Sequence, residues 1–458
     1  MLQTSTYGEF SLHLHSRLRG HRIPLSGMIE VTYRCPLACL HCYNNLPMGD
    51  AVARAQELTV EEHHRILDEI AEAGCFWLTY TGGEIFARKD FFDIYRYAKQ
   101  KGFLITLFTN GLLINERVAN TLAEWRPFSI EISLYGATRE TYARLTRRPD
   151  AYDRVMRAIH LLLERQLPLK LKTVAVTLNR HEVYAMQRIA EDLGVPFKFD
   201  PHINARIDCS HSPLATRLSP EEVVELDLRD PKRCQEWVDL LQRVQKPAAP
   251  VMQRSPLYLC GGGVTAFAID PYGRLSICVL SHRDTYDLRR GSFREGWERF
   301  FGQIRARTIT RPTKCTRCGI RPMCVTCPAT SELEHGDPEK PVDYFCHIAH
   351  LRAYALEIDV PEHGACAYCP GGDRYEEILE EVRRLRERVA RGEYLTERPS
   401  VWALQTGSPS GCGAGCSTCS AGVPIDPAGP DALIPVIPVR NTPDWKGNEK
   451  GYCEEDRE

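Results

Sequence analysis

Residues 28–43 read Met-Ile-Glu-Val-Thr-Tyr-Arg-Cys-Pro-Leu-Ala-Cys-Leu-His-Cys-Tyr. The apolar run Met28–Tyr33 predicts a β-strand. Three cysteines follow it directly, Cys35, Cys39 and Cys42, in C-x3-C-x2-C spacing. Three thiolates this close together can ligate three corners of a cubic iron–sulfur cluster, which leaves the fourth iron without a protein ligand. An open iron can coordinate a substrate or cofactor, so the spacing indicates chemistry rather than passive electron transfer.

Outward from this stretch, short apolar runs alternate with amphipathic segments from residue 28 to about residue 204, which predicts an α/β domain with a parallel sheet. The predicted strands are Met28–Tyr33, Trp77–Thr81, Leu104–Thr109, Ser129–Leu134, Leu169–Thr177 and Phe197–Asp200. The predicted helices are Glu61–Ala73, Phe91–Lys101, Arg117–Trp125, Val155–Arg165 and His181–Leu193. The pattern fits either a partial barrel or a doubly wound sheet. In both folds, residues that do chemistry lie after the carboxyl ends of strands, where the cysteine loop also lies.

Composition excludes several classes of protein. The chain has 458 residues, enough for two or three domains, with 43% hydrophobic and 26% charged residues. A net charge of −2 gives no reason to expect nucleic acid or an anionic membrane as a partner. No apolar run is long enough to span a membrane, and the first residues lack a secretory signal. In such a chain, 19 cysteines favour metal ligation over disulfides and predict a cytoplasmic protein.

A second motif, Thr81-Gly82-Gly83-Glu84, ends the second predicted strand. Glycines let a backbone approach a ligand closely, and a carboxylate can bind an ammonium group. Together with the cysteine loop, this motif resembles the radical S-adenosylmethionine (SAM) superfamily over roughly residues 28–200. The resemblance implies a partial (β/α)6 TIM-like barrel. It also implies that the iron–sulfur cluster and SAM together generate a 5′-deoxyadenosyl radical.

The resemblance implies a role for each motif residue. Cys35, Cys39 and Cys42 would ligate a [4Fe–4S] cluster whose free iron SAM chelates. Gly82, Gly83 and Glu84 would hold the methionine amino group, and His41 would lie close to the adenine. Strand-end position places Glu131 and Ser133 near the ribose or methionine carboxylate, and Asn110 near the active centre. A structural zinc site fits the triad poorly, because His41 lies between two of the cysteines in so short a loop.

Further cysteines follow downstream: Cys260, Cys278, Cys315, Cys318, Cys324, Cys327 and Cys346. Their order resembles the SPASM extension of peptide-modifying radical SAM enzymes, which houses two auxiliary clusters. The resemblance assigns Cys315, Cys318, Cys324 and Cys346 to one [4Fe–4S] cluster, and Cys260, Cys278 and Cys327 to the other. Two residues separate Cys324 from Cys327, where the family usually has three, and a pair of zinc ribbons is the competing interpretation. Either Cys209, Cys234 or a tail cysteine supplies the missing ligand, or one iron stays open.

The other cysteines leave alternatives open. Cys75 lies in an apolar run and is expected to be a core thiol. Cys366-x2-Cys369 is a metal site, a redox pair or a chance spacing. In the tail, Cys412, Cys416 and Cys419 repeat the first spacing without its strand or Gly-Gly-Glu context. That segment could bind a further cluster with Cys453 or with Cys366 and Cys369, cap an auxiliary cluster, or be a fused peptide substrate.

These patterns divide the chain into six predicted parts. They are an N-terminal segment (1–24), a radical SAM core (25–215), a helical connector (216–252), a Cys-rich SPASM domain with little regular structure (253–350), a helical extension (351–400) and an irregular tail (401–458). Within the extension, Asp373–Tyr394 has the spacing of an amphipathic helix.

The predicted function is a radical SAM/SPASM oxidoreductase that oxidatively modifies a ribosomal peptide or protein. The products would carry a thioether link, a carbon–carbon crosslink or a related oxidation. We expect a flavodoxin- or ferredoxin-type electron donor. Few residues precede the first strand, so a separate small protein would present the peptide. The alternatives are a small-molecule enzyme of cofactor or tetrapyrrole biosynthesis and a non-enzymatic iron–sulfur carrier.

Overall fold

The computed structural model of the chain describes residues 7–18, 20–244, 255–363 and 365–397. Four tail cysteines, Cys412, Cys416, Cys419 and Cys453, lie outside the described residues. The interpretations of the tail as a cluster site, a cap or a substrate therefore stay predictions.

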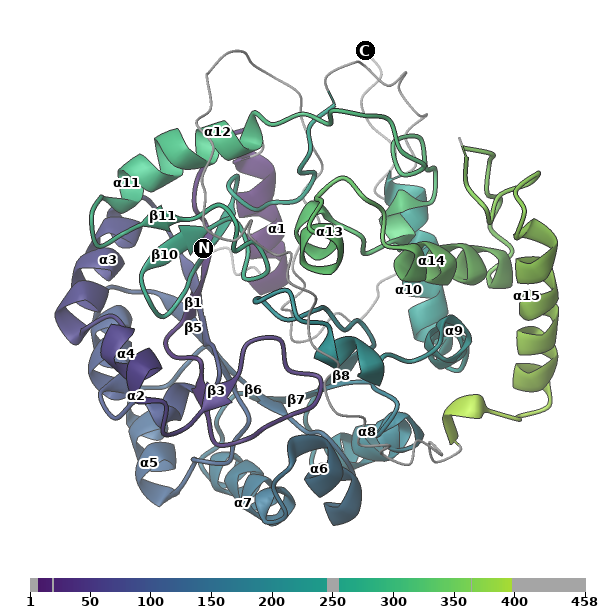
Figure 1. The fold of residues 1–458 in the computed structure, drawn as a ribbon. Coiled ribbons are helices and arrows are strands. Elements are labelled where there is room, and N and C mark those ends of the chain that lie inside the picture. The colour runs from purple at the N-terminus through teal and green to yellow at the C-terminus, as the bar shows by residue number, and fades with distance from the viewer. Residues whose placement is uncertain (1–6, 19, 245–254, 364, 398–458) are drawn as a thin grey trace, which may run out of the picture.

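A curved parallel sheet forms the core of the first half of the chain (Figure 1). Its strands follow one another in sequence order without a reversal, which identifies a partial barrel and excludes the doubly wound alternative. All five neighbouring pairs are parallel, as predicted. The strands are β1 (Ser26–Glu30), β4 (Trp77–Thr81), β5 (Leu104–Thr109), β6 (Ser129–Ser133), β7 (Leu169–Val174) and β8 (Phe197–Asp200).

Helices cover the outer face of this sheet, where Figure 1 shows them in an arc around the strands. They bury an apolar layer of strand residues that includes Ile29, Tyr80, Leu107 and Ile132. Thr59 caps the N-terminus of the helix that begins at Val60, where Thr59 and Glu62 form a reciprocal capping box. The helices are α3 (Val60–Glu72), α4 (Phe91–Gln100), α5 (Glu116–Glu124), α7 (Ala151–Glu164) and α8 (Val183–Asp192).

Strand side chains alternate between the two faces of the sheet, and those on the inner face of the barrel are mostly polar. In the parallel registers, Phe108 lies beside Glu131, and Ser133 beside Lys172. Lys172 in turn lies beside Lys198. Charged and hydroxyl side chains therefore face the barrel interior near the carboxyl ends of the strands.

The Cys-rich region continues the same sheet. Strand β9 (Ala266–Ile269) pairs in parallel with β1, and β10 (Arg274–Ser276) and β11 (Tyr286–Asp287) follow as antiparallel strands. Gly273 forms the turn between β9 and β10 with a φ of 85°, a conformation that favours glycine. This region contains more regular structure than its sequence indicated, because strands of two to four residues are too short to show a periodicity.

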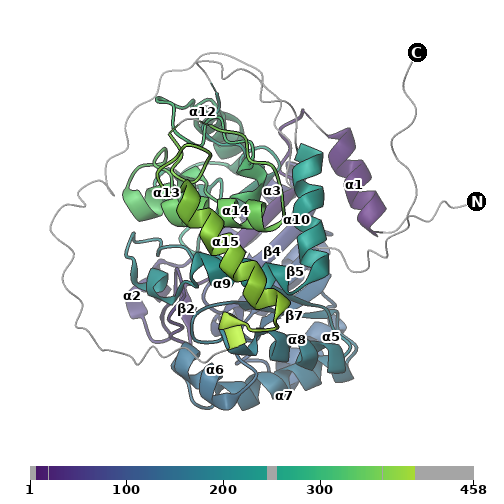
Figure 2. The ribbon, with the colours of Figure 1, turned by 90° about the vertical axis from the view of Figure 1, so that its right-hand side faces the viewer.

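Helices from the C-terminal part of the described chain pack beside the open edge of the barrel (Figure 2). The predicted amphipathic helix is confirmed as α15 (Tyr375–Ala390). It packs on α14 (Asp343–Ala355), which also contacts α9 (Pro220–Leu228). Helices α10 (Pro231–Val244) and α13 (Pro328–His335) also belong to this part. Helix α11 (Phe293–Glu295) instead contacts α3, and α12 (Phe301–Arg305) follows it on that side (Figure 1).

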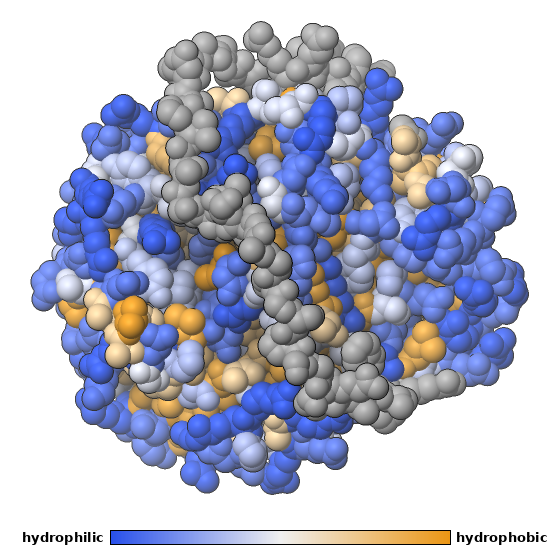
Figure 3. All heavy atoms as spheres, in the orientation of Figure 1, coloured by the Kyte–Doolittle hydropathy of each residue, from blue (hydrophilic) through white to orange (hydrophobic). Residues whose placement is uncertain are grey.

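Several short elements complete the fold. Helix α1 (Tyr7–Arg17) precedes the barrel, and α2 (Ala51–Gln56) follows a small pair of strands, β2 (Arg34–Cys35) and β3 (Leu46–Pro47). Helix α6 (Arg139–Thr146), which the sequence pattern did not indicate, lies between β6 and α7. Hydrophilic residues cover most of the rim of the face in Figure 3. No helix of the described residues combines the length and hydropathy that a membrane span requires.

Candidate active site

Backbone hydrogen bonds from the end of α6 hold the cysteine loop in place. The amide of Ala38 donates to the Thr146 carbonyl at 3.0 Å, and the amide of Leu40 donates to the Leu145 carbonyl at 3.2 Å. On the other side, the guanidinium of Arg206 donates to the Cys42 carbonyl at 3.1 Å. The loop is therefore fixed by two segments that lie more than 100 residues downstream.

Gly82 and Gly83 pack directly under the backbone that leads into this loop. The Gly83 amide donates to the Thr32 carbonyl at 2.7 Å. A Cβ atom on Gly82 would lie 2.2 Å from the Thr32 carbonyl oxygen, and one on Gly83 would lie 2.4 Å from that of Tyr33. Gly82 also has a φ of 127°. Both positions therefore require glycine so that the end of β4 can touch the start of the cysteine loop.

The Glu84 carboxylate ties together the ends of β4 and β5. It accepts hydrogen bonds from the Thr109 hydroxyl at 2.7 Å, the Asn110 amide at 2.9 Å and the Phe86 amide at 3.2 Å. Burial raises the pKa of Glu84 to about 7, although these hydrogen bonds lower it. The Asn110 side-chain amide donates to Cys35 Sγ at 3.4 Å, so this network also orients the first cysteine.

The three cysteines open onto one cavity of about 300 Å³. Its lining brings together predicted residues from the cysteine loop and from three strand ends: Cys35, Cys39, Cys42, His41, Gly82, Gly83, Asn110 and Ser133. The His41 ring lies 5.0 Å from that of Tyr135, and its Nδ1 is buried with no hydrogen-bond partner. Burial lowers the pKa of His41 to about 4, so the ring is neutral at pH 7. A neutral ring with an unused nitrogen can accept or donate a hydrogen bond to a bound ligand.

Glu131 is placed differently from Ser133. It is not among the described residues that line this cavity. Its side chain is fully buried and forms ion pairs with Lys198 at 2.9 Å and Lys172 at 3.4 Å. Its predicted contact with ribose or carboxylate stays a prediction, whereas its observed partners are the two lysines.

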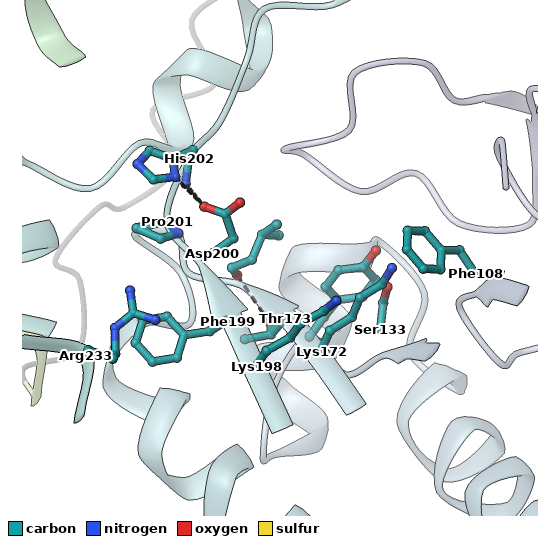
Figure 4. Close-up of a pocket in the computed structure, with 12 residues that line it drawn as sticks. Phe108, Ser133, Lys172, Thr173, Lys198, Phe199, Asp200, Pro201, His202 and Arg233 are labelled. Carbon is teal, nitrogen blue, oxygen red and sulfur yellow. Dashed lines mark hydrogen bonds and ion pairs between the residues drawn. The ribbon is translucent and has the colours of Figure 1, made fainter. Parts of the chain in front are cut away.

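A second cavity, of about 520 Å³, adjoins the first and shares Phe108, Ser133, Tyr135, Lys172, Val174 and His202 with it. Figure 4 shows Lys172 and Lys198 extending side by side from β7 and β8 toward Phe108 and Ser133. Because the two lysines share the single carboxylate of Glu131, this wall of the cavity has an excess of positive charge. Burial lowers the pKa of Lys172 to about 7. These lysines carry no motif that a sequence reveals, because only strand register brings them together.

The donor set of the first cavity fits an iron–sulfur cluster. The three thiols are unpaired by disulfides, and soft thiolate ligands favour iron–sulfur clusters and zinc. Burial, with a contribution from Glu84, raises the pKa of Cys35 to about 12. Without metal the thiol is therefore protonated, and ligation of a metal would displace the proton.

The cysteines of the SPASM-like region fall into two groups. In one, the Cys278 pKa rises to about 12 because of burial and the neighbouring Cys327 and Cys260 thiols. Cys278 also contributes, after burial, Glu30 and Cys42, to the raised pKa of Tyr43. The Cys260, Cys278 and Cys327 group therefore lies close to the end of β1 and the cysteine loop.

The other group contains Cys315, Cys318, Cys324 and Cys346. After burial, Cys324 and Cys318 raise the pKa of Cys315 to about 11. The Cys366 thiol and burial raise the pKa of Cys346 most, and Cys324 adds to the rise. The second group also meets Cys366, and the division of these cysteines into two ligand sets stays a prediction.

Of the candidates for a further ligand of the first group, Cys234 lies elsewhere. Its thiol donates to the Asp227 carbonyl at 3.3 Å, and the groups that perturb its pKa, after burial, are Asp227, Asp230 and Arg233. Cys209 lies in a turn whose neighbour Ile207 donates to the Tyr43 carbonyl at 3.0 Å. Cys75 is a buried core thiol, as expected.

Comparisons with known proteins agree with this geometry. A family model of the radical SAM superfamily matches residues 29–190. The chain is 24% identical over 328 residues to the AdoMet-dependent heme synthase of Methanosarcina barkeri. This alignment covers 67% of the chain and 92% of the synthase. It is 29% identical over 171 residues to the PqqA peptide cyclase of Bradyrhizobium diazoefficiens. That match covers 37% of this chain and less than half of the cyclase, 44%.

Among solved structures, SuiB of Streptococcus suis bound to the precursor peptide SuiA matches with a TM-score of 0.54 and 16% identity. The match covers 74% of this chain and 80% of SuiB, and at this identity it shows the fold alone. The fold, the cysteine loop and the family match agree over the first half of the chain. The chain contains a radical SAM domain over residues 29–190.

Proposed function

We propose that this enzyme oxidatively modifies a ribosomally made peptide or protein, by a thioether link, a carbon–carbon crosslink or a related oxidation. Cys35, Cys39 and Cys42 hold the SAM-binding cluster. The two downstream groups hold auxiliary clusters, which makes three [4Fe–4S] clusters in all. When bound, SAM and its cluster supply a 5′-deoxyadenosyl radical that abstracts a hydrogen atom from the substrate.

The observation that carries the proposal is the position of the Cys260, Cys278 and Cys327 group. It is joined to the barrel through β9 and β10, and Cys278 lies near Tyr43, the residue after Cys42. Crosslinking removes two hydrogens from the substrate. One leaves as an atom that ends in 5′-deoxyadenosine, and the other leaves as a proton. The remaining electron must pass to an acceptor, and a neighbouring cluster is such an acceptor.

The residues of the first cavity then have distinct tasks. Asn110 orients Cys35 through its 3.4 Å hydrogen bond, and neutral His41 offers its unpaired Nδ1 toward the adenine end of SAM. Gly82 and Gly83 line the cavity and form the wall for the methionine end, and Glu84, buried behind them, would hold the methionine amino group. The adjoining 520 Å³ cavity provides space for the substrate side chain.

A reaction with candidate precursor peptides tests the proposal. A flavodoxin- or ferredoxin-type donor, or dithionite, supplies electrons, and a separate small peptide-binding protein is included where a neighbouring gene encodes one. The expected product has lost two hydrogens per crosslink by mass spectrometry, together with formation of 5′-deoxyadenosine. Cys278→Ser should keep 5′-deoxyadenosine formation and lose the crosslink, whereas Cys35→Ser should lose both. A crosslink formed normally by Cys278→Ser would contradict the assigned role of the second group.

The excess positive charge of Lys172 and Lys198 favours a second candidate, a tetrapyrrole or another small substrate with carboxylates. The long alignment with the heme synthase points the same way. An iron porphyrin with four propionate-type carboxylates is the probe, and its Soret band reports binding. Wild type should shift the band and Lys172→Met/Lys198→Met should not, if this candidate is correct. A band that does not shift with wild type excludes it.

A further inference from the structure

Four buried side chains outside the cysteine groups described above converge on one point. They are His350 on α14, and His363, Cys366 and Cys369 in the loop between α14 and α15. One ligand atom from each lies within 4.8 Å of the others, and all four residues are at most 3% exposed. Both cysteines are free thiols, so the pair is not a disulfide.

Backbone carbonyls set the tautomer of both imidazoles. His350 Nδ1 lies 2.8 Å from the Cys346 carbonyl oxygen, and His363 Nδ1 lies 3.0 Å from that of Pro361. A carbonyl oxygen can only accept, so each Nδ1 carries the proton and each Nε2 keeps a free lone pair. A second-shell hydrogen bond of this kind is how proteins orient histidine ligands of metals.

The distances within the group match a tetrahedral metal site. His350 Nε2 lies 3.5 Å from both Cys366 Sγ and Cys369 Sγ. The His363 ring lies against Cys369 Sγ, with its Nδ1 at 3.3 Å and its Nε2 at 3.7 Å. Zinc bonds of about 2.3 Å to sulfur and about 2.0 Å to nitrogen place sulfur and nitrogen about 3.5 Å apart at the tetrahedral angle. In a simple hydrogen-bond network each thiol would approach one nitrogen, whereas here two thiols are equidistant from the same Nε2.

The loop that carries the cysteines is built to hold this geometry. In the turn Cys366-Ala367-Tyr368-Cys369, the Gly372 amide donates to the Cys369 carbonyl at 2.8 Å. Tyr368 is fully buried, and its hydroxyl donates to Asp343 at 2.8 Å at the start of α14. Its carbonyl accepts from the Tyr354 hydroxyl at 2.9 Å near the end of α14. The turn is therefore pinned along the helix that carries His350.

We infer that His350, His363, Cys366 and Cys369 form a structural zinc site that staples this loop to α14. Two thiolates and two neutral imidazoles balance the charge of a divalent zinc ion, so the buried site has no net charge. The site lies beside the second cysteine group, because Cys366 contacts Cys346 and His363 contacts Cys318. By fixing His350, the zinc would hold the turn of α14 that carries Cys346.

Zinc and iron analysis of the whole protein, as wild type and as two variants, tests this inference. After anaerobic reconstitution with iron, sulfide and zinc, we expect one tightly bound zinc per chain. Zinc-edge X-ray absorption, which iron does not disturb, should show two sulfur ligands at about 2.3 Å and two nitrogen ligands at about 2.0 Å. Cys366→Ser/Cys369→Ser should lose the zinc and keep its iron. Cys75→Ser, which removes another buried thiol, should keep both metals.

The wild-type spectrum stands on its own if the double variant fails to fold. Absence of zinc from wild type, or a zinc with four sulfur ligands, would overturn the inference. A double variant that keeps zinc but loses about four iron ions would also overturn it, because these cysteines would then ligate an auxiliary cluster. None of these outcomes depends on SAM cleavage or on the identity of the substrate.

Discussion

Replacing Gly83 with alanine tests why the Gly-Gly-Glu motif needs its glycines. A Cβ at this position would lie 2.4 Å from the Tyr33 carbonyl oxygen and 2.6 Å from that of Arg34. Both are backbone atoms, so the end of β4 must move away from the cysteine loop. That movement breaks the hydrogen bonds from Gly83 to Thr32 at 2.7 Å and from Glu84 to Arg34 at 3.1 Å.

The cost follows from these contacts. Two backbone hydrogen bonds contribute about 2 kcal/mol together, and overpacking costs about 1–3 kcal/mol more. We therefore expect Gly83→Ala to lower the free energy of unfolding by about 3–5 kcal/mol, and Tm by roughly 6–20 °C for a domain of this size. Urea unfolding of the metal-free protein measures the effect without SAM present. Iron retained after reconstitution should fall as well.

Gly49→Ala is the matched control, because it lies just beyond the same loop and nothing lies within 4 Å of its added Cβ. It should change stability by no more than about 0.5 kcal/mol. Equal stability of the two variants would refute the packing argument. A Gly83→Ala protein of normal stability that binds SAM weakly would show instead that the glycine serves only the approach of the ligand.

Two further predictions concern buried carboxylates. Asp227 pairs with Arg352 at 2.8 Å and Arg233 at 2.7 Å, so Asp227→Asn should cost about 3–5 kcal/mol in urea unfolding, whereas exposed Asp192→Asn should cost little. Burial raises the pKa of Asp227, but Arg352 and Arg233 lower it further, to below its usual range. The stabilisation that the Asp227 carboxylate provides is therefore present above about pH 4 and lost in stronger acid. If the difference in unfolding free energy between wild type and Asp227→Asn already shrinks at pH 6, this reasoning is wrong. Glu182 accepts hydrogen bonds from the Ala137 amide at 2.6 Å and the Thr141 hydroxyl at 2.7 Å, at the start of α6. Glu182→Ala should therefore lower the free energy of unfolding by about 2–3 kcal/mol. It should also reduce iron retention, because α6 holds the cysteine loop. Unchanged iron content in Glu182→Ala would show that α6 is not needed to hold the cysteine loop in place.

The sequence predicted the barrel because each strand and helix has its own periodic signal. Leu104–Thr109 was predicted with the bounds that β5 has, and the chain order of the strands became their order in the sheet. Helix α6 has no periodic sequence signal, because its eight residues, Arg139–Thr146, are mostly polar and form only about two turns. Its part in holding the cysteine loop rests on backbone carbonyls, which carry no sequence signal.

The candidate site likewise combines residues that local spacing predicts with residues that only the fold brings together. Spacing found Cys35, Cys39, Cys42 and Gly82–Glu84, since their geometry is set within one loop or one strand end. Lys172 and Lys198 could not be found in this way, because adjacency across a sheet depends on register. His350 likewise lies on an apolar helix, 16 positions before Cys366, and only the packing of the loop on α14 reveals it as a partner of the Cys366 and Cys369 pair.

Glu30 lies near both the cysteine loop and the group that contains Cys278. It ends β1, accepts from the Tyr33, Tyr43 and Asn44 side chains at 3.1, 3.0 and 2.7 Å, and is 1% exposed. Burial raises the pKa of Glu30 to about 8, although these hydrogen bonds lower it. The carboxyl is therefore mostly neutral at pH 7 and adds little negative charge between the Cys42 and Cys278 groups. Thiolate charges on both sides would raise its pKa further. Where the two groups hold the proposed clusters, the end of β1 would link them through a polar network that adds little charge of its own.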